Sequence, residues 1–441
     1  MTDLNRLFWR VHFWAGLVTA PIVLFAALTG LLYVFTPQIE ASRHAALDHV
    51  PVGVRLQSLD AQVAAVEAAF PDQAVRCVVP AHAAGETTQV FLRAAHEGHA
   101  HGNAAAKGAD HDHGLPRGSI AYVDPYTASV VGQLPEMQRW KTWARKLHSS
   151  MLQGDGWRWP VELAASWMLV IFATGLTMWW PRSRGNGGPG WRALLPRLGR
   201  GRQTWRDLHA VLALALGAVL AVVLVTGLTW SRYAGDNFRW AQEASGQGAV
   251  KSASGLKSAV VEGAQPITWQ TAWERARITA QDIALQMTPP RGADGVWRIE
   301  NFDRAQPRRR FTLVLDGYSG AALFASGWTQ MPVLAQATAL GIPFHRGEFG
   351  AWNQVLLALA ALAAIFSVVS GIVMWWQRRP RGRLAAPSLE RAHVRRVPVW
   401  IWALAAGLSL ALPVFGCSLL LFASLEAVRL LRRPTPPVSF N

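Results

Sequence analysis

Five long apolar stretches constrain this chain more than any other feature. They cover Phe13–Thr36, Leu163–Trp180, Leu208–Ser231, Phe349–Trp376 and Val397–Leu425 and are almost free of charge. Each is close to or above the roughly 18–20 residues that a helix needs to cross a bilayer core. The first apolar run is too long for a signal peptide, so we expect it to remain as an anchor. With 51% hydrophobic and only 16% charged residues, the sequence predicts an integral membrane protein.

The basic residues predict the orientation. Segments 181–207 and 377–396 each contain seven arginines and a single acid, Asp207 or Glu390. Short basic loops stay in the cytoplasm, so segments 37–147 and 232–345 are expected outside, in the periplasm of a bacterial inner membrane. The net charge of +16 is then a consequence of topology, and no nucleic-acid partner is needed to explain it.

The last apolar stretch has two interpretations. A single crossing would leave Arg429, Arg432 and Arg433 outside, against the positive-inside rule. Pro413 and Gly416 lie within the stretch, so a hairpin that returns to the cytoplasm is the alternative. We expect a fifth single helix.

The chain also contains an internal repeat of 197 residues. His12 and His209 are 197 positions apart, and each is followed 17 positions later by a Thr-Gly pair. His148 and His345 are also 197 positions apart. Each outer segment has a helical stretch followed by strands with an Asp-Pro-Tyr or Asp-Gly-Tyr turn, at Asp124 and Asp316, which predicts a small α+β domain.

These observations predict a membrane α-helical bundle, with four core spans and a C-terminal hydrophobic span, that carries two periplasmic α+β domains by parallel duplication. Repeat 1 covers residues 1–180, with spans 11–36 and 160–180 around an outer domain at 37–147. Repeat 2 covers residues 208–376, with spans 208–231 and 349–376 around an outer domain at 232–345. The basic loop 181–207 joins the repeats, and the basic loop 377–396 and the C-terminal segment 397–441 follow the second repeat.

Four of the 13 histidines lie at matched span ends. Ionisable groups at a membrane edge usually mark function, although a single one can simply bond to a headgroup. Two imidazoles without cysteine or carboxylate fall short of a zinc site but suit the two axial positions of haem iron. If equivalent spans face each other across a twofold axis, His12 pairs with His209 on the inner side and His148 with His345 on the outer side, which predicts two haems b.

Small residues line the same spans. The Thr-Gly and Ser-Gly pairs either let helices approach closely or leave room for a flat macrocycle, and the sequence leaves both interpretations open. The chain has only two cysteines, Cys77 and Cys417, so no disulfide framework or thiolate metal site is expected.

A His-rich tract at 96–114 interrupts the first outer domain and has no counterpart in the second. Clustered imidazoles bind cations such as Cu(II), Zn(II) or Ni(II). We expect a flexible metal-collecting loop, and a neutral solvated insertion is the alternative. Its candidate ligands are His96, His99, His101, His111 and His113.

Several motifs lie within about residues 5–380, namely RVHFWAGL, LHSSMLQGDG, FHRGEFG and the VDPYTASVVG and LDGYSGAAL turns. Together they resemble the PepSY-associated transmembrane proteins. This iron-regulated inner-membrane group includes haem-containing siderophore reductases, so the resemblance implies membrane haem held by His12, His148, His209 and His345. It also implies reduction of ferric iron in a periplasmic siderophore. The His-rich insertion and the C-terminal span depart from the core pattern and leave the substrate open.

The leading hypothesis is therefore a ferric-siderophore reductase that takes electrons from quinol or a cytoplasmic donor, since no GxGxxG nucleotide site is visible. Reduction of a cupric or other metal complex through the His-rich tract is one alternative. A haem-free binding or regulatory module is another, and it predicts a colourless protein. A permease is weakest among membrane functions, because spans one, three and four lack acidic and basic side chains near mid-bilayer.

Overall fold

The computed structural model describes residues 3–94, 115–184, 195–197, 199, 201–248, 255–280, 283–303 and 305–432, with the backbone alone at 180–184. The chain is mostly helical, and within the described residues five helices are long and apolar enough to cross a membrane. It is therefore a multi-pass membrane protein. The predicted His-rich tract at 96–114 lies outside the described residues.

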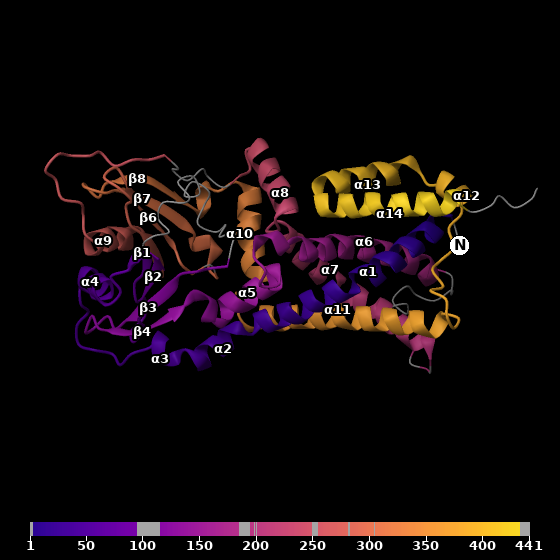
Figure 1. The fold of residues 1–441 in the computed structure, drawn as a ribbon, viewed down its shortest axis with the longest axis horizontal. Coiled ribbons are helices and arrows are strands. Elements are labelled where there is room, and N and C mark those ends of the chain that lie inside the picture. Colours follow the sequence, from indigo (N-terminus) through magenta and orange to yellow (C-terminus); the bar gives the residue numbers. More distant parts are fainter. Residues whose placement is uncertain are drawn as a thin grey trace, which may run out of the picture.

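Four long helices form a bundle, which lies beside the sheet in Figure 1. They are α1 (Asp3–Val34), α6 (Trp159–Arg184), α7 (Arg202–Leu228) and α11 (Ala351–Arg378). Because α1 and α7 each pack against both α6 and α11, α1 and α7 are diagonal partners across the bundle. We call the end toward the sheet the sheet end, and the opposite end, where the N-terminus lies, the basic end.

An antiparallel sheet covers the other end of the molecule, with strand order β4-β3-β2-β1-β5-β6-β7-β8. The sequence predicts two outer domains, and the structure joins their strands into one sheet through the pairing of Val78 on β1 with Met287 on β5. The strands are β1 (Gln73–Val79), β2 (Thr88–Ala94), β3 (Ser119–Val123), β4 (Val130–Pro135), β5 (Leu285–Thr288), β6 (Val296–Asn301), β7 (Phe311–Asp316) and β8 (Ala322–Gly327).

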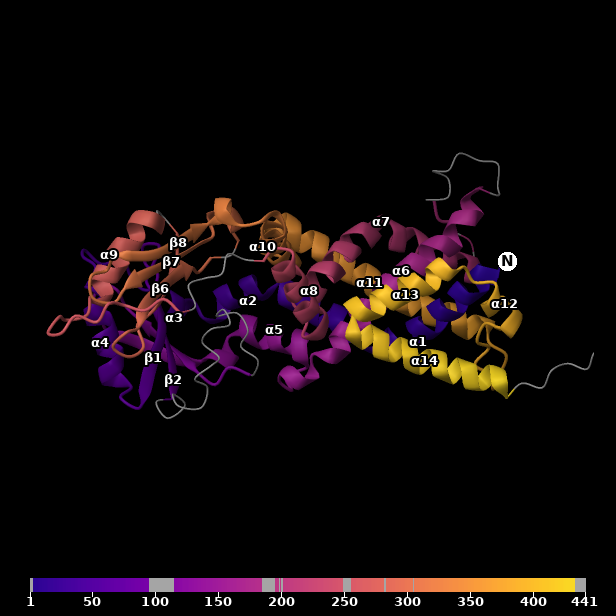
Figure 2. The same cartoon turned by 90° about the horizontal axis from the view of Figure 1, so that it is seen from above.

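Two helices, α4 (Leu59–Ala69) and α9 (Trp269–Ala280), cover one face of this sheet, and Figure 2 shows them side by side. A single core holds buried side chains from both halves, such as Val63, Leu92, Ile299 and Leu313. The helix starts are also capped across the halves. The Asp60 carboxylate accepts from the Trp269 N–H at 2.8 Å, and the Gln270 amide oxygen accepts from the Leu59 N–H at 2.9 Å. Because free N–H groups at a helix start need acceptors, each half completes the other.

Shorter helices connect the sheet and the bundle. They are α2 (Thr36–Arg43), α3 (Ala45–Asp48), α5 (Trp140–Ser150), α8 (Tyr233–Ala244) and α10 (Val333–His345). A further short helix, α12 (Arg391–Arg395), lies at the basic end, after α11. In each half the last strand leads into a helix that enters the bundle, α5 after β4 and α10 after β8. The two predicted turns form as expected, because Asp124 accepts from the Tyr126 N–H at 2.8 Å and Asp316 from the Tyr318 N–H at 3.0 Å.

The C-terminal apolar stretch is a hairpin of α13 (Val399–Ala411) and α14 (Pro413–Leu431). Helical geometry is disfavoured for a residue before proline, and Leu412 accordingly leaves it, with φ −121° and ψ 82°. The hairpin tip lies at the sheet end, where the Asn237 amide donates to the Leu410 carbonyl at 2.8 Å. At the basic end Glu426 pairs with the buried Arg10 of α1.

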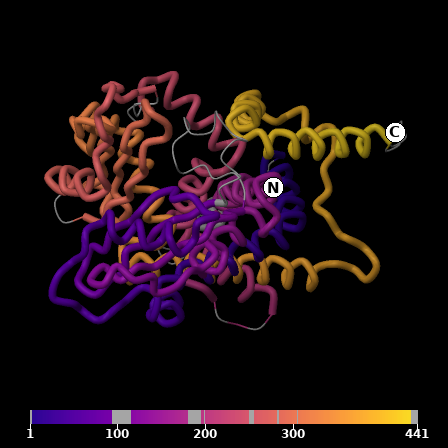
Figure 3. Tube along the Cα trace, turned by 60° about the vertical axis from the view of Figure 1, so that its left-hand side comes forward, coloured from indigo at the N-terminus to yellow at the C-terminus, as the bar shows by residue number. Residues whose placement is uncertain are grey.

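The single crossing expected at 397–425 is therefore replaced by the hairpin alternative, in which α14 is the arm long enough to count as a candidate span. Figure 3 shows the linker from α11 passing around the bundle to reach this hairpin. Both ends of the hairpin lie at the basic end, where Arg429 donates to the Leu389 carbonyl at 3.0 Å. Arg429 thus lies with the other arginines, as the positive-inside rule requires.

Candidate functional site

Two histidines face each other near the basic end of the bundle. His12 lies on α1 and His209 on α7, the diagonal helices, and their ring centroids are 6.5 Å apart. A second pair lies at the sheet end, where His148 in the last turn of α5 faces His345 at the end of α10 with ring centroids 6.4 Å apart. The structure thus brings the four sequence-selected histidines together in the two pairs expected from the repeat.

Each ring rests on a hydroxyl-glycine pair of a neighbouring helix. His12 contacts Thr174-Gly175 of α6, and His209 contacts Ser370-Gly371 of α11. At the sheet end, His148 contacts Thr29-Gly30 of α1, and His345 contacts Thr226-Gly227 of α7. We call these four dipeptides the seats. Sequence reasoning noted the small pairs but did not connect them to the histidines that they support.

The glycine of each seat lets the imidazole lie against the helix. A Cβ atom added at Gly227 would lie 2.9 Å from His345 Cε1, closer than side-chain carbons approach one another. The corresponding distances are 3.2 Å from Gly175 to His12 and 3.4 Å from Gly30 to His148, and 4.0 Å from Gly371 to His209. Glycine is therefore tightly required at Gly227 and least required at Gly371.

Hydrogen bonds define which ring nitrogen carries the proton. His12 Nδ1 is 3.1 Å from the Ile171 carbonyl, and His345 Nδ1 is 2.8 Å from the Val223 carbonyl. A carbonyl can only accept, so both Nδ1 atoms are donors.

The other two rings follow the same rule. Ser370 Oγ already donates to the Phe366 carbonyl at 2.6 Å, and it lies 2.8 Å from His209 Nδ1. Thr29 Oγ1 donates to the Phe25 carbonyl at 2.7 Å, and it lies 3.0 Å from His148 Nδ1. Each hydroxyl therefore accepts from the imidazole, and all four rings have Nε2 as a free lone pair.

Among the described residues, no hydrogen-bond partner meets the Nε2 atom of any of these four rings. Metal-ligating histidines usually donate their other ring N–H to a carbonyl or similar acceptor, which orients the ring. The seat hydroxyls supply that second contact for His148 and His209, and the Ile171 and Val223 carbonyls supply it for His12 and His345. Burial also lowers the pKa of His148 to about 4, with His345 acting in the same direction, so the neutral form that binds metals is favoured.

The spacing of each pair tests whether one metal ion fits between the rings. A metal–imidazole bond is about 2.0 Å, and an imidazole centroid lies about 1.15 Å from its own nitrogen, so two opposed ligands place their centroids about 6.3 Å apart. The observed separations are 6.5 and 6.4 Å. Both separations therefore match the spacing of two imidazoles that share one ion.

A cavity of about 1160 Å³ surrounds the basic-end pair. It lies between α1, α6, α7 and α11, and its walls are largely apolar, including Phe13, Met168 and Leu216 besides His12 and His209. His148 and His345 are not among its lining residues. A largely apolar cavity with a few convergent polar groups is typical of a cofactor site.

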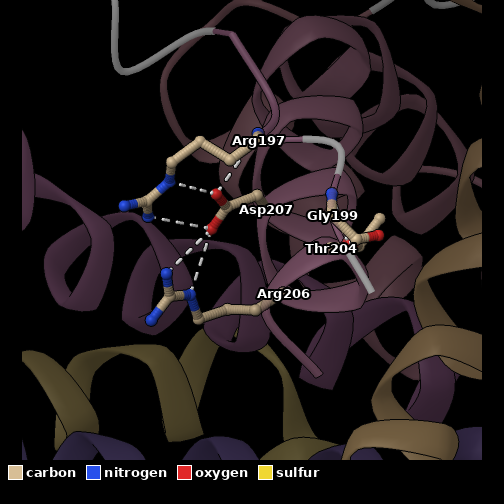
Figure 4. A network of polar contacts seen from close by, with 5 residues as sticks. All are labelled: Arg197, Gly199, Thr204, Arg206 and Asp207. Carbon is tan, nitrogen blue, oxygen red and sulfur yellow. Dashed lines mark hydrogen bonds and ion pairs between the residues drawn. The ribbon is translucent and has the colours of Figure 1, made fainter. Parts of the chain in front are cut away.

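Arginines surround the basic end of this cavity. Figure 4 shows Asp207 between Arg197 and Arg206, with Nε of Arg197 2.7 Å and Nη2 of Arg206 2.9 Å from the carboxylate. Two other lining arginines, Arg202 and Arg378, have no ion pair within the described residues. Arg378 instead lies over the Trp9 ring at 4.8 Å. The cavity therefore has a cationic rim that the sequence analysis interpreted only as a topology signal.

No group of three or more His, Cys, Asp or Glu side chains among the described residues is arranged to hold a metal ion. The predicted ligands of the His-rich tract, His96 to His113, lie outside the described residues.

The sequence model of one family, described as the PepSY-associated TM region, matches residues 9–378. The match contains all four paired histidines and the whole sheet, and it ends before the C-terminal hairpin. No curated protein sequence matches the chain significantly.

Proposed function

We infer the function from the premise that this chain belongs to the PepSY-associated TM region family. We propose that it is a di-haem b reductase of a bacterial inner membrane, which passes electrons across the bilayer and reduces ferric iron in periplasmic siderophore complexes. The observation that carries this proposal is the pair of facing imidazoles at each end of the bundle, spaced 6.5 and 6.4 Å apart.

The donor set supports haem more than another metal. Each pair offers two neutral imidazoles, and within the described residues no carboxylate or thiolate completes a tetrahedral site. A haem would need only two ligands from the protein, and it would supply reversible one-electron chemistry when bound. His12 and His209 would hold the inner haem, and His148 and His345 the outer haem.

The surroundings of the inner pair suit a haem in particular. The largely apolar cavity accommodates a flat macrocycle, and a haem carries two propionate groups. Arg202 and Arg378 at the rim supply cations for these carboxylates. The small residues of the seats are then ligand supports, beside their role in close helix packing.

The proposed orientation follows from charge. Arginine-rich connections face the cytoplasm under the positive-inside rule, so the sheet lies in the periplasm and the basic-end cavity opens toward the electron donor. The matched succession of elements and the repeated seats in the two halves support an internal parallel duplication. Quinol or a cytoplasmic protein is the proposed donor, and a metal complex near the sheet is the acceptor.

The first experiment is an absorption spectrum of the detergent-purified full chain, oxidised and then reduced with dithionite, with haem counted by pyridine haemochrome. We expect a low-spin b-type spectrum and about two haems per chain. His82→Ala serves as a matched control, because His82 is exposed and far in the sequence from the seats. A colourless protein made with ample haem supply would overturn the proposal in favour of a haem-free binding or regulatory module.

The second experiment tests the acceptor. Reduced protein is mixed with ferric siderophores or with cupric complexes, and reoxidation of the haem band is followed by stopped flow. Faster reoxidation by ferric siderophores supports the proposal. Reoxidation by cupric complexes alone would transfer the assignment to copper reduction.

A further inference from the structure

Three arginines gather on the sheet where its two halves meet. Arg76 lies on β1, Arg93 on β2, and Arg291 in the loop after β5, the strand that pairs with β1. The proposed electron-transfer function does not use any of them. The placement of Arg76 and Arg93 follows from the register of β1 and β2. Arg291 lies near enough for the charges of Arg93 and Arg76 to act on it.

A β-bulge directs Arg76 to the face that carries Arg93. Val75 pairs with Leu92 and Cys77 with Phe91, so Arg76 is the extra residue in β1, and bulges commonly redirect a side chain. Its guanidinium lies over the Phe91 ring at 5.5 Å. Phe91 and Arg93 are two residues apart on one strand and therefore share a face.

This arginine face is opposite to the core. Leu92, which alternates with Phe91 and Arg93, is buried in the core beneath α4 and α9. On the neighbouring strand, Tyr122 shares the arginine face because Ala121 and Val123 belong to that core. Arg139, which immediately precedes α5, lies over the Tyr122 ring at 5.8 Å. The arginine face is thus the side of the sheet from which α5 leaves.

The cluster has more positive than negative charge. Arg76 pairs with Glu136 at 2.9 Å, with about a third of its side chain exposed. Within the described residues, neither Arg93 nor Arg291 has an ion pair, and Arg93 Nε is buried without a hydrogen-bond partner. Burial, together with the charges of Arg93 and Arg76, lowers the pKa of Arg291. Among the residues that the structure describes, three guanidinium groups therefore meet one carboxylate, an arrangement that an anion would stabilise.

The cluster is also close to the outer histidine pair along the chain. Glu136 lies just before α5, and His148 is in the last turn of this 11-residue helix, which is about 16 Å long. An anion bound at the arginines would lie on the side of the sheet that leads directly to His148.

We propose that Arg76, Arg93 and Arg291 form a binding site for an anionic metal chelate, one in which carboxylate groups hold the ion. Planar guanidinium groups bind carboxylates bidentately, and three of them suit a ligand with several such groups. This inference rests on the proposed function, because it names the class of substrate that is held near the outer histidines.

The test measures binding without electron transfer. Ga(III)–citrate is a redox-inert anionic chelate, and its binding to the detergent-purified full chain is titrated by calorimetry. The neutral tris(acetohydroxamato)Ga(III) complex and citrate alone are titrated in parallel. We expect Ga(III)–citrate to bind, with weaker binding at higher salt because exposed charges are screened.

The informative variant is Arg93→Gln with Arg291→Gln, which leaves the Arg76–Glu136 pair intact. We expect Ga(III)–citrate binding to weaken by about tenfold or more, the scale of losing charge-assisted hydrogen bonds. Arg55→Gln removes an exposed arginine from the loop before α4 and should leave binding unchanged. Arg93→Lys with Arg291→Lys should recover part of the affinity, because charge is kept while the bidentate fork is lost.

Equal binding of Ga(III)–citrate to wild type and the double Gln variant would overturn the proposal. Citrate alone binding as tightly as its gallium complex would also overturn it, because the site would then recognise carboxylates without the metal. Haem content is measured on the same samples. Chelate binding by a haem-free protein contradicts only the proposed function, whereas full haem content without chelate binding contradicts only this inference.

Discussion

The two histidine pairs have the same local geometry in different surroundings. Both have ring centroids about 6.5 Å apart and both use hydroxyl-glycine seats. The basic-end pair lies on two long bundle helices and lines a cavity with an arginine rim. The sheet-end pair lies on α5 and α10, short helices that continue from the sheet. The seats therefore set the orientation of the rings, whereas the elements around each pair set its access and its charge.

Removing one histidine of either pair should have the largest effect, because it tests whether the two pairs hold separate haems. We expect His12→Ala and His148→Ala each to retain about one haem per chain, because bis-histidine ligation needs both rings. His148→Ala should still be reduced by quinol but fail to reduce ferric siderophore, whereas His12→Ala should not accept electrons from quinol at all. Haemochrome counts and stopped-flow spectra measure this. If both variants keep two haems, the proposal that each histidine pair holds one haem is wrong.

Glycine substitutions in the seats should give a graded effect. Gly227→Ala places a methyl group 2.9 Å from His345 Cε1, and Gly371→Ala places one 4.0 Å from His209 Cε1. We expect the first to displace His345, shift the outer-haem redox potential and lower haem occupancy, while the second is tolerated. Potentiometric titration of each haem distinguishes the two. Equal redox potentials and haem occupancies in the two glycine variants would show that the seats do not position the rings.

The arginine rim should strengthen haem retention at the basic-end pair only. Arg378→Gln removes a cation beside the basic-end cavity, so we expect inner-haem retention to weaken by about tenfold, on the scale of about 1.5 kcal/mol for a charge-assisted bond. The outer haem should be unaffected. Arg396→Gln is the control, since Arg396 is 75% exposed and pairs with Asp3. Haem transfer to apomyoglobin measures the retention, and equal loss from both sites would contradict a rim specific to the inner pair.

Acid should lower the stability of the sheet end before that of the basic end. This is the smallest of the four effects that we expect. Backbone N–H groups, that of Ser319 first, lower the pKa of Asp316 to about 2. Its ionised form therefore stabilises the fold above the unfolded-state pKa of about 3.9, and this stabilisation is lost as pH falls from about 4 toward 2. We expect Asp316→Asn to reduce the melting temperature at pH 6 and to flatten its decline in acid.

The matching turn in the first half supplies the comparison. Asp124 accepts from the Tyr126 N–H, whereas Asp316 accepts from Tyr318, Ser319 and Ala259. Asp124→Asn should therefore cost less stability than Asp316→Asn. Thermal unfolding followed by circular dichroism between about pH 3 and 6, a range that brackets an ordinary carboxyl pKa of about 3.9, measures both variants. A larger loss of stability in Asp124→Asn than in Asp316→Asn would contradict this comparison.

Much of the site was predictable because the repeat is visible in the sequence. His12 and His209, and His148 and His345, stand 197 positions apart, and the structure places the two rings of each pair opposite each other. The seats were not predictable in the same way. Thr29-Gly30 follows His12 by 17 positions in the sequence, yet it supports His148, which comes from α5 at the other end of the half. That contact depends on helix packing.

The C-terminal stretch and the sheet show the same limit. Composition identifies 397–425 as apolar, but the break at Leu412 and the pairing of Glu426 with Arg10 make it a hairpin. Strand patterns predict two small α+β domains, but pairing of β1 with β5 and the shared core beneath α4 and α9 join them. Hydrophobic periodicity says which face is buried, and it does not say against which partner.

Hydropathy and spacing in the sequence were enough to predict the membrane character of the chain and the four histidines at matched offsets of 197 residues, because both are local properties that need no partner to be recognised. Only the tertiary structure decided which seat supports which imidazole, that a cavity with an arginine rim surrounds one pair, and that three arginines meet at the seam of the sheet. These features join residues far apart in the chain, and only the packing of helices and the register of strands bring such residues together.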